Sequence, residues 1–97
     1  MEAAIRNSTH ENFQLDLAPG WCLRADPLQW MLYRERSRRG QSTWQPIAFV
    51  GSNKRMLARV MAREGLFDHL DLQPAVHTFL SASPQSFKKW SNAFGGE

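Results

Sequence analysis

The apolar residues of this chain change their spacing once, at Gly51-Ser52-Asn53, and this change restricts the fold more than any other feature of the sequence. Before it, apolar and polar residues alternate, as they do in half-buried β-strands. After it, apolar residues recur every three or four positions, as they do on the buried side of a helix. This order predicts an α+β fold, in which an antiparallel β-meander of three to four strands precedes three helices in a two-layer arrangement.

The alternating segments are separated by residues that favour turns. Pro19-Gly20 marks the first turn, and Asp26-Pro27 ends the second segment. Residues 36–42 are polar and basic and contain a glycine, which predicts a hairpin loop. Pro46 has no N–H for a strand ladder, so the last strand is expected at a sheet edge or bulged there. The expected strands are residues 13–17, 21–25, 29–35 and 43–50.

The clearest helical pattern lies in residues 54–65. Ser52 or Asn53 can cap its N-terminus, and Gly65 suits its C-terminus. The apolar stripe of this helix consists of Met56, Leu57, Val60 and Met61.

Two shorter helices are expected after it. Pro74 fits the first turn of a helix that runs to about Ala82, and Ser83-Pro84 predicts the start of a helix that runs to about Phe94. This last helix carries an aromatic ridge, which either docks on the sheet or inserts into a groove of a partner. The ridge consists of Phe87, Trp90 and Phe94.

Length and cysteine content indicate the type of protein. With 97 residues, the chain is expected to form one α+β domain over residues 12–97, preceded by a flexible polar arm over residues 1–11. Cys22 is the only cysteine, whereas a secreted domain of this size usually needs disulfides. The N-terminus lacks the apolar region of a secretion signal, and no apolar run approaches the ~20 residues that cross a membrane. We therefore expect a cytoplasmic protein without a membrane partner.

The chain lacks the residue patterns that catalysis requires. His10, His69 and His77 are scattered, without the spacing of metal ligands. Cys22 stands between two apolar residues in a predicted strand, which favours a buried thiol over a nucleophile. The segment Gly51–Lys54 lacks the spacing of a phosphate-binding P-loop. We expect a protein that is no enzyme, acts by binding, and uses no cofactor, metal or small-molecule substrate.

Charge is distributed unevenly along the chain. The net charge is +3, yet residues 34–63 hold eight basic residues against Glu35, which gives +7 for this segment. The remaining residues hold four basic and eight acidic side chains, which gives −4. A protein with one basic region opposite a mildly acidic one is therefore expected.

The basic segment contains the candidate anion-binding residues. Arg55, Arg59 and Arg63 are four residues apart and form one ridge of the predicted helix, which starts at Lys54. Arginine suits bidentate contacts to phosphate or carboxylate, although a charged helix face also occurs simply because it is solvated. The candidate set is Arg36, Arg38, Arg39, Lys54, Arg55, Arg59 and Arg63.

Large apolar residues also occur on both faces of the predicted hairpin of residues 29–50. Regular alternation places Trp30 and Trp44 on one face, and Tyr33 and Phe49 on the other. Either helices cover both faces, or one face meets a partner. We expect a homodimer or a complex with another protein, with at least one of these four aromatic residues at the interface.

Two resemblances extend these expectations. The segment Gly51–Arg55 and the helix after it resemble the double-stranded-RNA-binding domain, in which a lysine cluster at a helix N-terminus contacts phosphates, although the register differs by one residue and the leading helix of that family is missing. Residues 21–66 resemble small phage and prophage proteins in their aromatic hairpin, Trp30–Arg34 and Trp44–Phe49, their basic loop and their amphipathic helix. This resemblance implies an accessory protein of a mobile element, of the anti-defence or nucleic-acid-associated type.

Two functions therefore remain open from the sequence. The first is contact with nucleic acid phosphates, or with a nucleic-acid-handling complex, through the arginines. The second is an inhibitor of a host defence system (anti-CRISPR-like) or an adaptor, in which the arginines meet an acidic protein surface and the apolar sheet face makes the contact. No recognition helix with base-reading Asn or Gln is apparent, so we expect nucleic acid binding without sequence preference.

Overall fold

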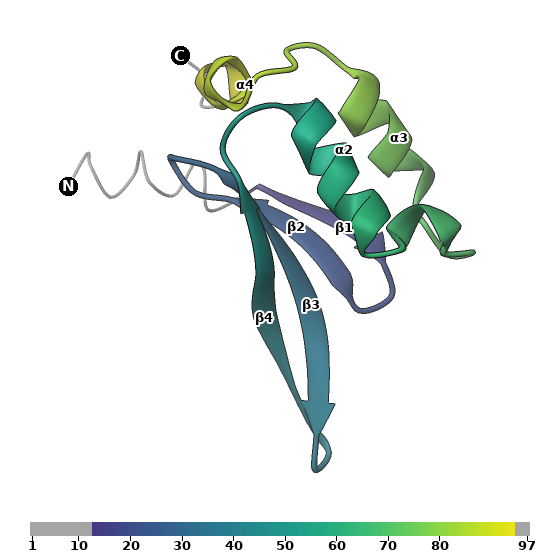
Figure 1. The fold of residues 1–97 in the computed structure, drawn as a ribbon. Coiled ribbons are helices and arrows are strands. Elements are labelled where there is room, and N and C mark those ends of the chain that lie inside the picture. The colour runs from purple at the N-terminus through teal and green to yellow at the C-terminus, as the bar shows by residue number, and fades with distance from the viewer. Residues whose placement is uncertain (1–12, 95–97) are drawn as a thin grey trace, which may run out of the picture.

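The computed structural model describes residues 13–94 and confirms the α+β fold. Four antiparallel strands are followed by the helices in the expected order (Figure 1). The N-terminal segment of residues 1–11, which the sequence predicts to be flexible, lies outside the described residues. The elements are β1 (Gln14–Ala18), β2 (Trp21–Ala25), β3 (Trp30–Arg38), β4 (Gln41–Val50), α2 (Lys54–Arg63), the 3₁₀ helix η1 (Leu66–Asp68), α3 (Pro74–Ser81) and α4 (Phe87–Phe94).

The four strands have the order β1-β2-β3-β4, but the last two extend beyond the others. The pairing of β2 with β3 ends at Trp21 opposite Arg34. The pairing of β3 with β4 continues from there to Arg38 opposite Gln41. Residues 35–44 therefore form a two-stranded ribbon that projects from the sheet, here called the arm (Figure 1).

The end of the arm differs from the expected loop of residues 36–42. The strands run to Arg38 and resume at Gln41, which leaves Arg39-Gly40 as the whole turn. Both turn residues have positive φ, 52° and 79°, as a tight two-residue hairpin turn requires. The segment is polar because the arm lies outside the core, and polarity alone does not distinguish an exposed ribbon from a loop.

A β-bulge interrupts β4 near its middle. Leu32 lies opposite Ala48 and Tyr33 opposite Pro46, so Ile47 has no partner in β3. The sequence prediction that Pro46 marks an edge or a bulge is confirmed in both respects, since β4 is also the last strand of the sheet.

The helices cover one face of the sheet, and the core lies between these two layers (Figure 1). Trp30, at the centre of the core, is fully buried. The rings of Phe87 and Trp90 lie 5.0 and 5.4 Å from its ring, which confirms that the aromatic ridge of α4 docks on the core. Other buried residues come from every layer, among them Leu17, Leu23, Leu32, Leu57, Met61 and Val76.

The last helix starts later than Ser83-Pro84 predicts. α4 begins at Phe87, because the preceding loop is bonded to the start of α2. The N–H of Lys54 donates to the Gln85 carbonyl (2.8 Å), and the N–H of Phe87 donates to the Ser52 carbonyl (2.9 Å). Ser86 then accepts a bond from the N–H of Lys89 (3.2 Å), as a helix cap does.

Candidate nucleic-acid interface

One face of the arm and of the residues at its base alternates basic and uncharged polar side chains across the two strands. The register places Arg34 opposite Gln45, Arg36 opposite Thr43, and Arg38 opposite Gln41. Side chains directly opposite one another point to the same face, and so do residues two apart along a strand. All six residues are exposed. This surface, called the basic face, consists of Arg34, Arg36, Arg38, Gln41, Thr43 and Gln45.

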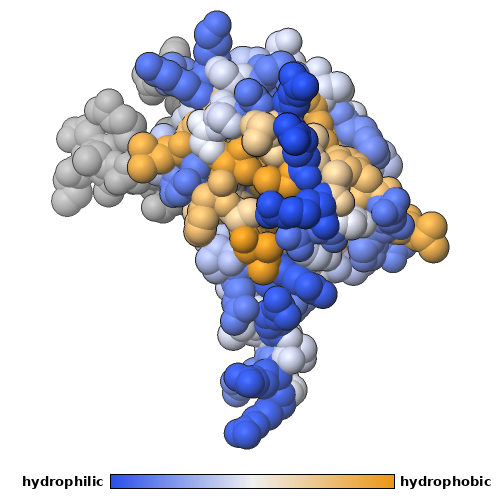
Figure 2. Space-filling view, in the orientation of Figure 1, coloured by the Kyte–Doolittle hydropathy of each residue, from blue (hydrophilic) through white to orange (hydrophobic). Residues whose placement is uncertain are grey.

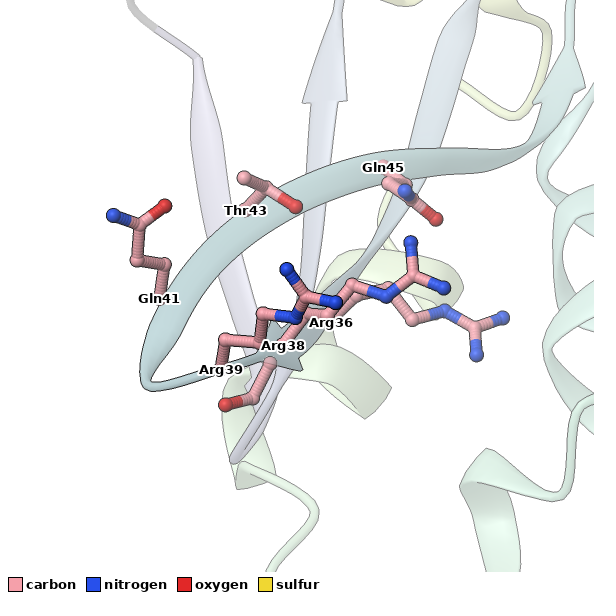
Figure 3. A pocket seen from close by; sticks show the side chains of 7 residues that line it. Arg36, Arg38, Arg39, Gln41, Thr43 and Gln45 are labelled. Carbon is pink, nitrogen blue, oxygen red and sulfur yellow. The ribbon is translucent and has the colours of Figure 1, made fainter.

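The basic face continues the helix-covered side of the sheet, because Arg34 follows Leu32 by two residues on β3. Its members other than Arg34, together with Ser37 and with Arg39 at the tip, line an open depression along the arm. Figure 3 shows the guanidinium groups of Arg36, Arg38 and Arg39 projecting toward one side of the hairpin. A bound anion on that side would meet several guanidinium groups at once.

The charges of the arm are not neutralised within the described residues. Among residues 13–94, the one ion pair joins Arg63 to Glu64 at 3.7 Å. Glu35, the acid of the arm, lies opposite Trp44 and so on the other face. Arg34 differs from the other arginines of the basic face, because its guanidinium lies over the ring of Trp21, 5.1 Å from the ring centre. The arginines beyond it are free to bind an anion.

A second basic surface lies on α2. Leu57 and Met61 are buried and define the inner side of this helix. Arg55, Arg59 and Arg63 are exposed on the opposite side, at the spacing that the sequence predicted. They point away from the sheet and belong to the helix layer, whereas the basic face belongs to the sheet layer. Figure 2 shows the arm as hydrophilic, and α2 with hydrophilic groups beside an apolar patch.

Lys54 does not belong to the anion-binding set, and its inclusion is corrected here. The residue is only 2% exposed, and its Nζ donates to the carbonyls of Phe79 (2.8 Å) and Ala82 (2.9 Å). Its Nζ also lies 4.3 Å from the centre of the Phe79 ring. Burial lowers the pKa of Lys54. The start of α2 packs on the end of α3, so Lys54 points inward and satisfies one carbonyl of α3 and that of its C-cap residue, Ala82, instead of a ligand.

The opposite face of the sheet is not covered by the helices. It carries Met31, Tyr33 and Phe49, and the bulge adds Trp44, because the extra residue reverses the alternation of β4 between Ala48 and Gln45. Trp44 is 47% and Phe49 56% exposed. These four residues are called the open face. Trp30, also expected at an interface, lies in the core and is unavailable to a partner.

The bulge also explains which residues of the basic face the sequence reasoning missed. Regular alternation places Gln45 on the side of Phe49, whereas the structure places it beside Arg34. Gln41 was missed because the loop was expected to reach residue 42, and Thr43 because the first residue of the expected strand 43–50 was given no face. Pro46 was the signal that could have found them, since a bulge there reverses the faces of all β4 residues before it.

Neither a metal site nor a membrane-crossing helix is found in residues 13–94. No three His, Cys, Asp or Glu residues in this part of the chain are grouped so that they could hold a metal ion. No helix within the same range combines the length and apolar character needed to cross a membrane.

Comparisons with known proteins give no family for the chain. It matches no protein-family model, and no curated protein or solved structure shows significant similarity to it. The proposals below therefore rest on the residues and their geometry.

Proposed function

We propose that this protein is a non-enzymatic nucleic-acid-binding protein whose arm holds the phosphate backbone. The observation that carries the proposal is the arm itself, a ribbon that projects from the sheet and presents unpaired arginines on a face without acidic residues. Arg36, Arg38 and Arg39 are the central contacts. Arginine binds phosphate oxygens in a bidentate manner, which favours it over other cations for this purpose.

The arm is better suited to a large anionic partner than to a small ligand. Its depression is open and its walls are exposed side chains, whereas sites for small molecules bury most of the ligand. The ridge of Arg55, Arg59 and Arg63 offers a second row of positive charge on the same side of the sheet. An extended polyanion can contact both surfaces, and a single small anion cannot.

The salt dependence of binding tests this function. Fluorescence anisotropy with labelled duplex DNA, single-stranded DNA and RNA should show affinity that falls steeply as salt rises. The slope of log K against log salt is negative, and each lost phosphate contact reduces its magnitude by about 0.9 on duplex DNA. The variant R36A/R38A/R39A should therefore reduce the magnitude of the slope by about 3.

The matched control is K88A/K89A, which removes two exposed cations from α4 and should leave the slope nearly unchanged. Absence of binding to all three nucleic acids at micromolar protein would refute the proposal. An equal loss in both variants would show that net charge, rather than the arm, attracts the nucleic acid.

The open face supports a second candidate function, an inhibitor or adaptor that binds another protein, or a second copy of this chain. Met31 lies directly opposite Phe49 on the neighbouring strand, and the helices leave both Phe49 and Trp44 exposed. Exposed aromatic clusters of this kind commonly mark protein interfaces.

Light scattering tests the self-associating form of this candidate. The protein should be a dimer at micromolar concentration, and Phe49→Lys should convert it to a monomer. Leu70→Lys is the control, because Leu70 is fully exposed outside the open face. A wild-type protein that stays monomeric, and that captures no protein partner dependent on Phe49, would exclude the open face as an interface.

A further inference from the structure

The uncharged members of the basic face are not explained by phosphate binding. Phosphate contacts require cations or simple donors and carry no sequence information, whereas base edges are read by specific side chains. Arginine pairs with guanine, glutamine pairs with adenine, and threonine contacts bases through its hydroxyl or its methyl group. The basic face alternates these three types, with arginine on β3 opposite Gln41, Thr43 or Gln45 on β4.

The polar groups of these three side chains are available to a ligand. No hydrogen bond within residues 13–94 involves the side chain of Gln41, Thr43 or Gln45, and all three residues are exposed. Figure 3 shows the three side chains projecting from β4, Thr43 and Gln45 near the guanidinium groups and the Gln41 amide directed away from them. Their donors and acceptors can therefore be used fully by a partner.

The dimensions of the arm fit one groove of one kind of duplex. Four residues of each strand lie beyond the sheet, which gives a ribbon about 14 Å long at about 3.4 Å per residue. The major groove of B-form DNA, about 12 Å wide and about 8.5 Å deep, admits a two-stranded ribbon. The minor groove is about 6 Å wide, and the major groove of RNA duplexes is deep and narrow.

The spacing along the strand also matches the spacing of base pairs. Residues two apart on one face are about 6.8 Å apart, which equals about two base-pair steps of about 3.4 Å. The three cross-strand pairs of the basic face therefore extend over about four steps. This predicts a recognised site of about five base pairs.

We propose that the basic face enters the major groove of duplex DNA and reads base edges, with Gln41, Thr43 and Gln45 as specificity-determining residues. The inference rests on the proposed function and goes beyond it, because it replaces the expected sequence-independent binding by a sequence preference. The arginines supply both guanine and phosphate contacts, and the helix layer abuts the duplex at the base of the arm.

The experiment is a selection of bound duplexes from a randomised DNA library, followed by anisotropy on the selected and a scrambled duplex. The full chain should enrich one short motif and bind it about 10-fold or more tightly than the scrambled sequence. Q41A/T43A/Q45A should lose most of this ratio and keep both its affinity for the scrambled duplex and its salt slope. Ser42→Ala, on the other face of the same strand, should keep the ratio.

The outcomes separate this inference from the function on which it rests. Binding to DNA with no enriched motif, or a motif that survives Q41A/T43A/Q45A, overturns the inference and leaves phosphate binding intact. So does equal affinity for an RNA duplex, or displacement by a ligand of the minor groove. Absence of binding to any nucleic acid overturns both, and circular dichroism confirms that the variants are folded in each case.

Discussion

Arg39 illustrates how a single residue combines a backbone cost with an exposed charge. Its φ is 52°, in the left-handed region that Gly and Asn occupy readily. Other residues adopt this conformation at a cost of about 1–2 kcal/mol. The turn therefore tolerates a less suitable residue at the tip, where its guanidinium group adds to the positive charge of the arm.

Replacing Arg39 should separate these two effects. Arg39→Asn suits the turn better and should slow amide hydrogen exchange along the arm, measured by NMR. The same change removes a charge and should weaken binding to duplex DNA several-fold. Faster exchange in the variant would show that the arginine stabilises the turn rather than straining it.

Cys22 gives a second prediction at this scale. Burial raises the pKa of its thiol to about 11, with Asp16 adding to the rise and Arg24 opposing it. The unfolded thiol, with a pKa near 9, loses its proton first as the pH increases. The free energy of unfolding should therefore fall by about 2–3 kcal/mol between pH 9 and pH 11, and not below pH 9.

Urea unfolding of the wild type and Cys22→Ala over this pH range measures the effect, because the variant retains every other titrating group. The difference in free energy of unfolding between the wild type and Cys22→Ala should shrink as the pH rises from 9 to 11. A constant difference would mean that the thiol titrates normally in the folded protein.

At the scale of elements, the periodicity of the sequence was sufficient to predict the strands and helices, but it could not predict how these elements pair and pack. Alternation identified β2, and helical spacing identified α2, because each pattern reflects burial on one side. The bulge at Ile47 depends on how β4 pairs with β3, so the faces of Trp44 and Gln45 could not be read from alternation alone. The role of Lys54 depends on α3, which lies 25 residues away from it in the sequence.

The junction of α2 and α3 can be tested through Lys54. Lys54→Met removes the donor for the carbonyls of Phe79 and Ala82, at the end of α3, and should lower the free energy of unfolding by about 2–4 kcal/mol. Arg55→Met, on the exposed side of the same helix, should change it by less than about 0.5 kcal/mol. Similar losses in urea unfolding would show that Lys54 contributes no specific contact.

For the whole molecule, the body and the arm are separable parts. Every buried apolar residue lies outside residues 35–44, so the core is complete without the arm. The sequence indicated a basic region between residues 34 and 63, but not that three of its eight basic residues stand on a projecting ribbon. That property arises from the shortness of β1 and β2 relative to β3 and β4.

Removal of the arm should therefore weaken nucleic acid binding strongly and preserve the fold. Joining Arg34 to Gln45 through Asn-Gly keeps a paired position on each side of the new turn. The free energy of unfolding should change by less than about 1 kcal/mol, measured by urea titration. A shortened chain that fails to unfold cooperatively would show that the arm supports the body.

The bulge at Ile47 also affects how copies of this chain meet at high concentration. β4 is an edge strand of ten residues, and a continuous edge of that length is a template for further strands and for fibre growth. Pro46 removes one N–H, and the unpaired residue after it breaks the repeat that an incoming strand must match. The irregularity that turns Gln45 toward the arginines thus also protects the protein against edge-to-edge aggregation.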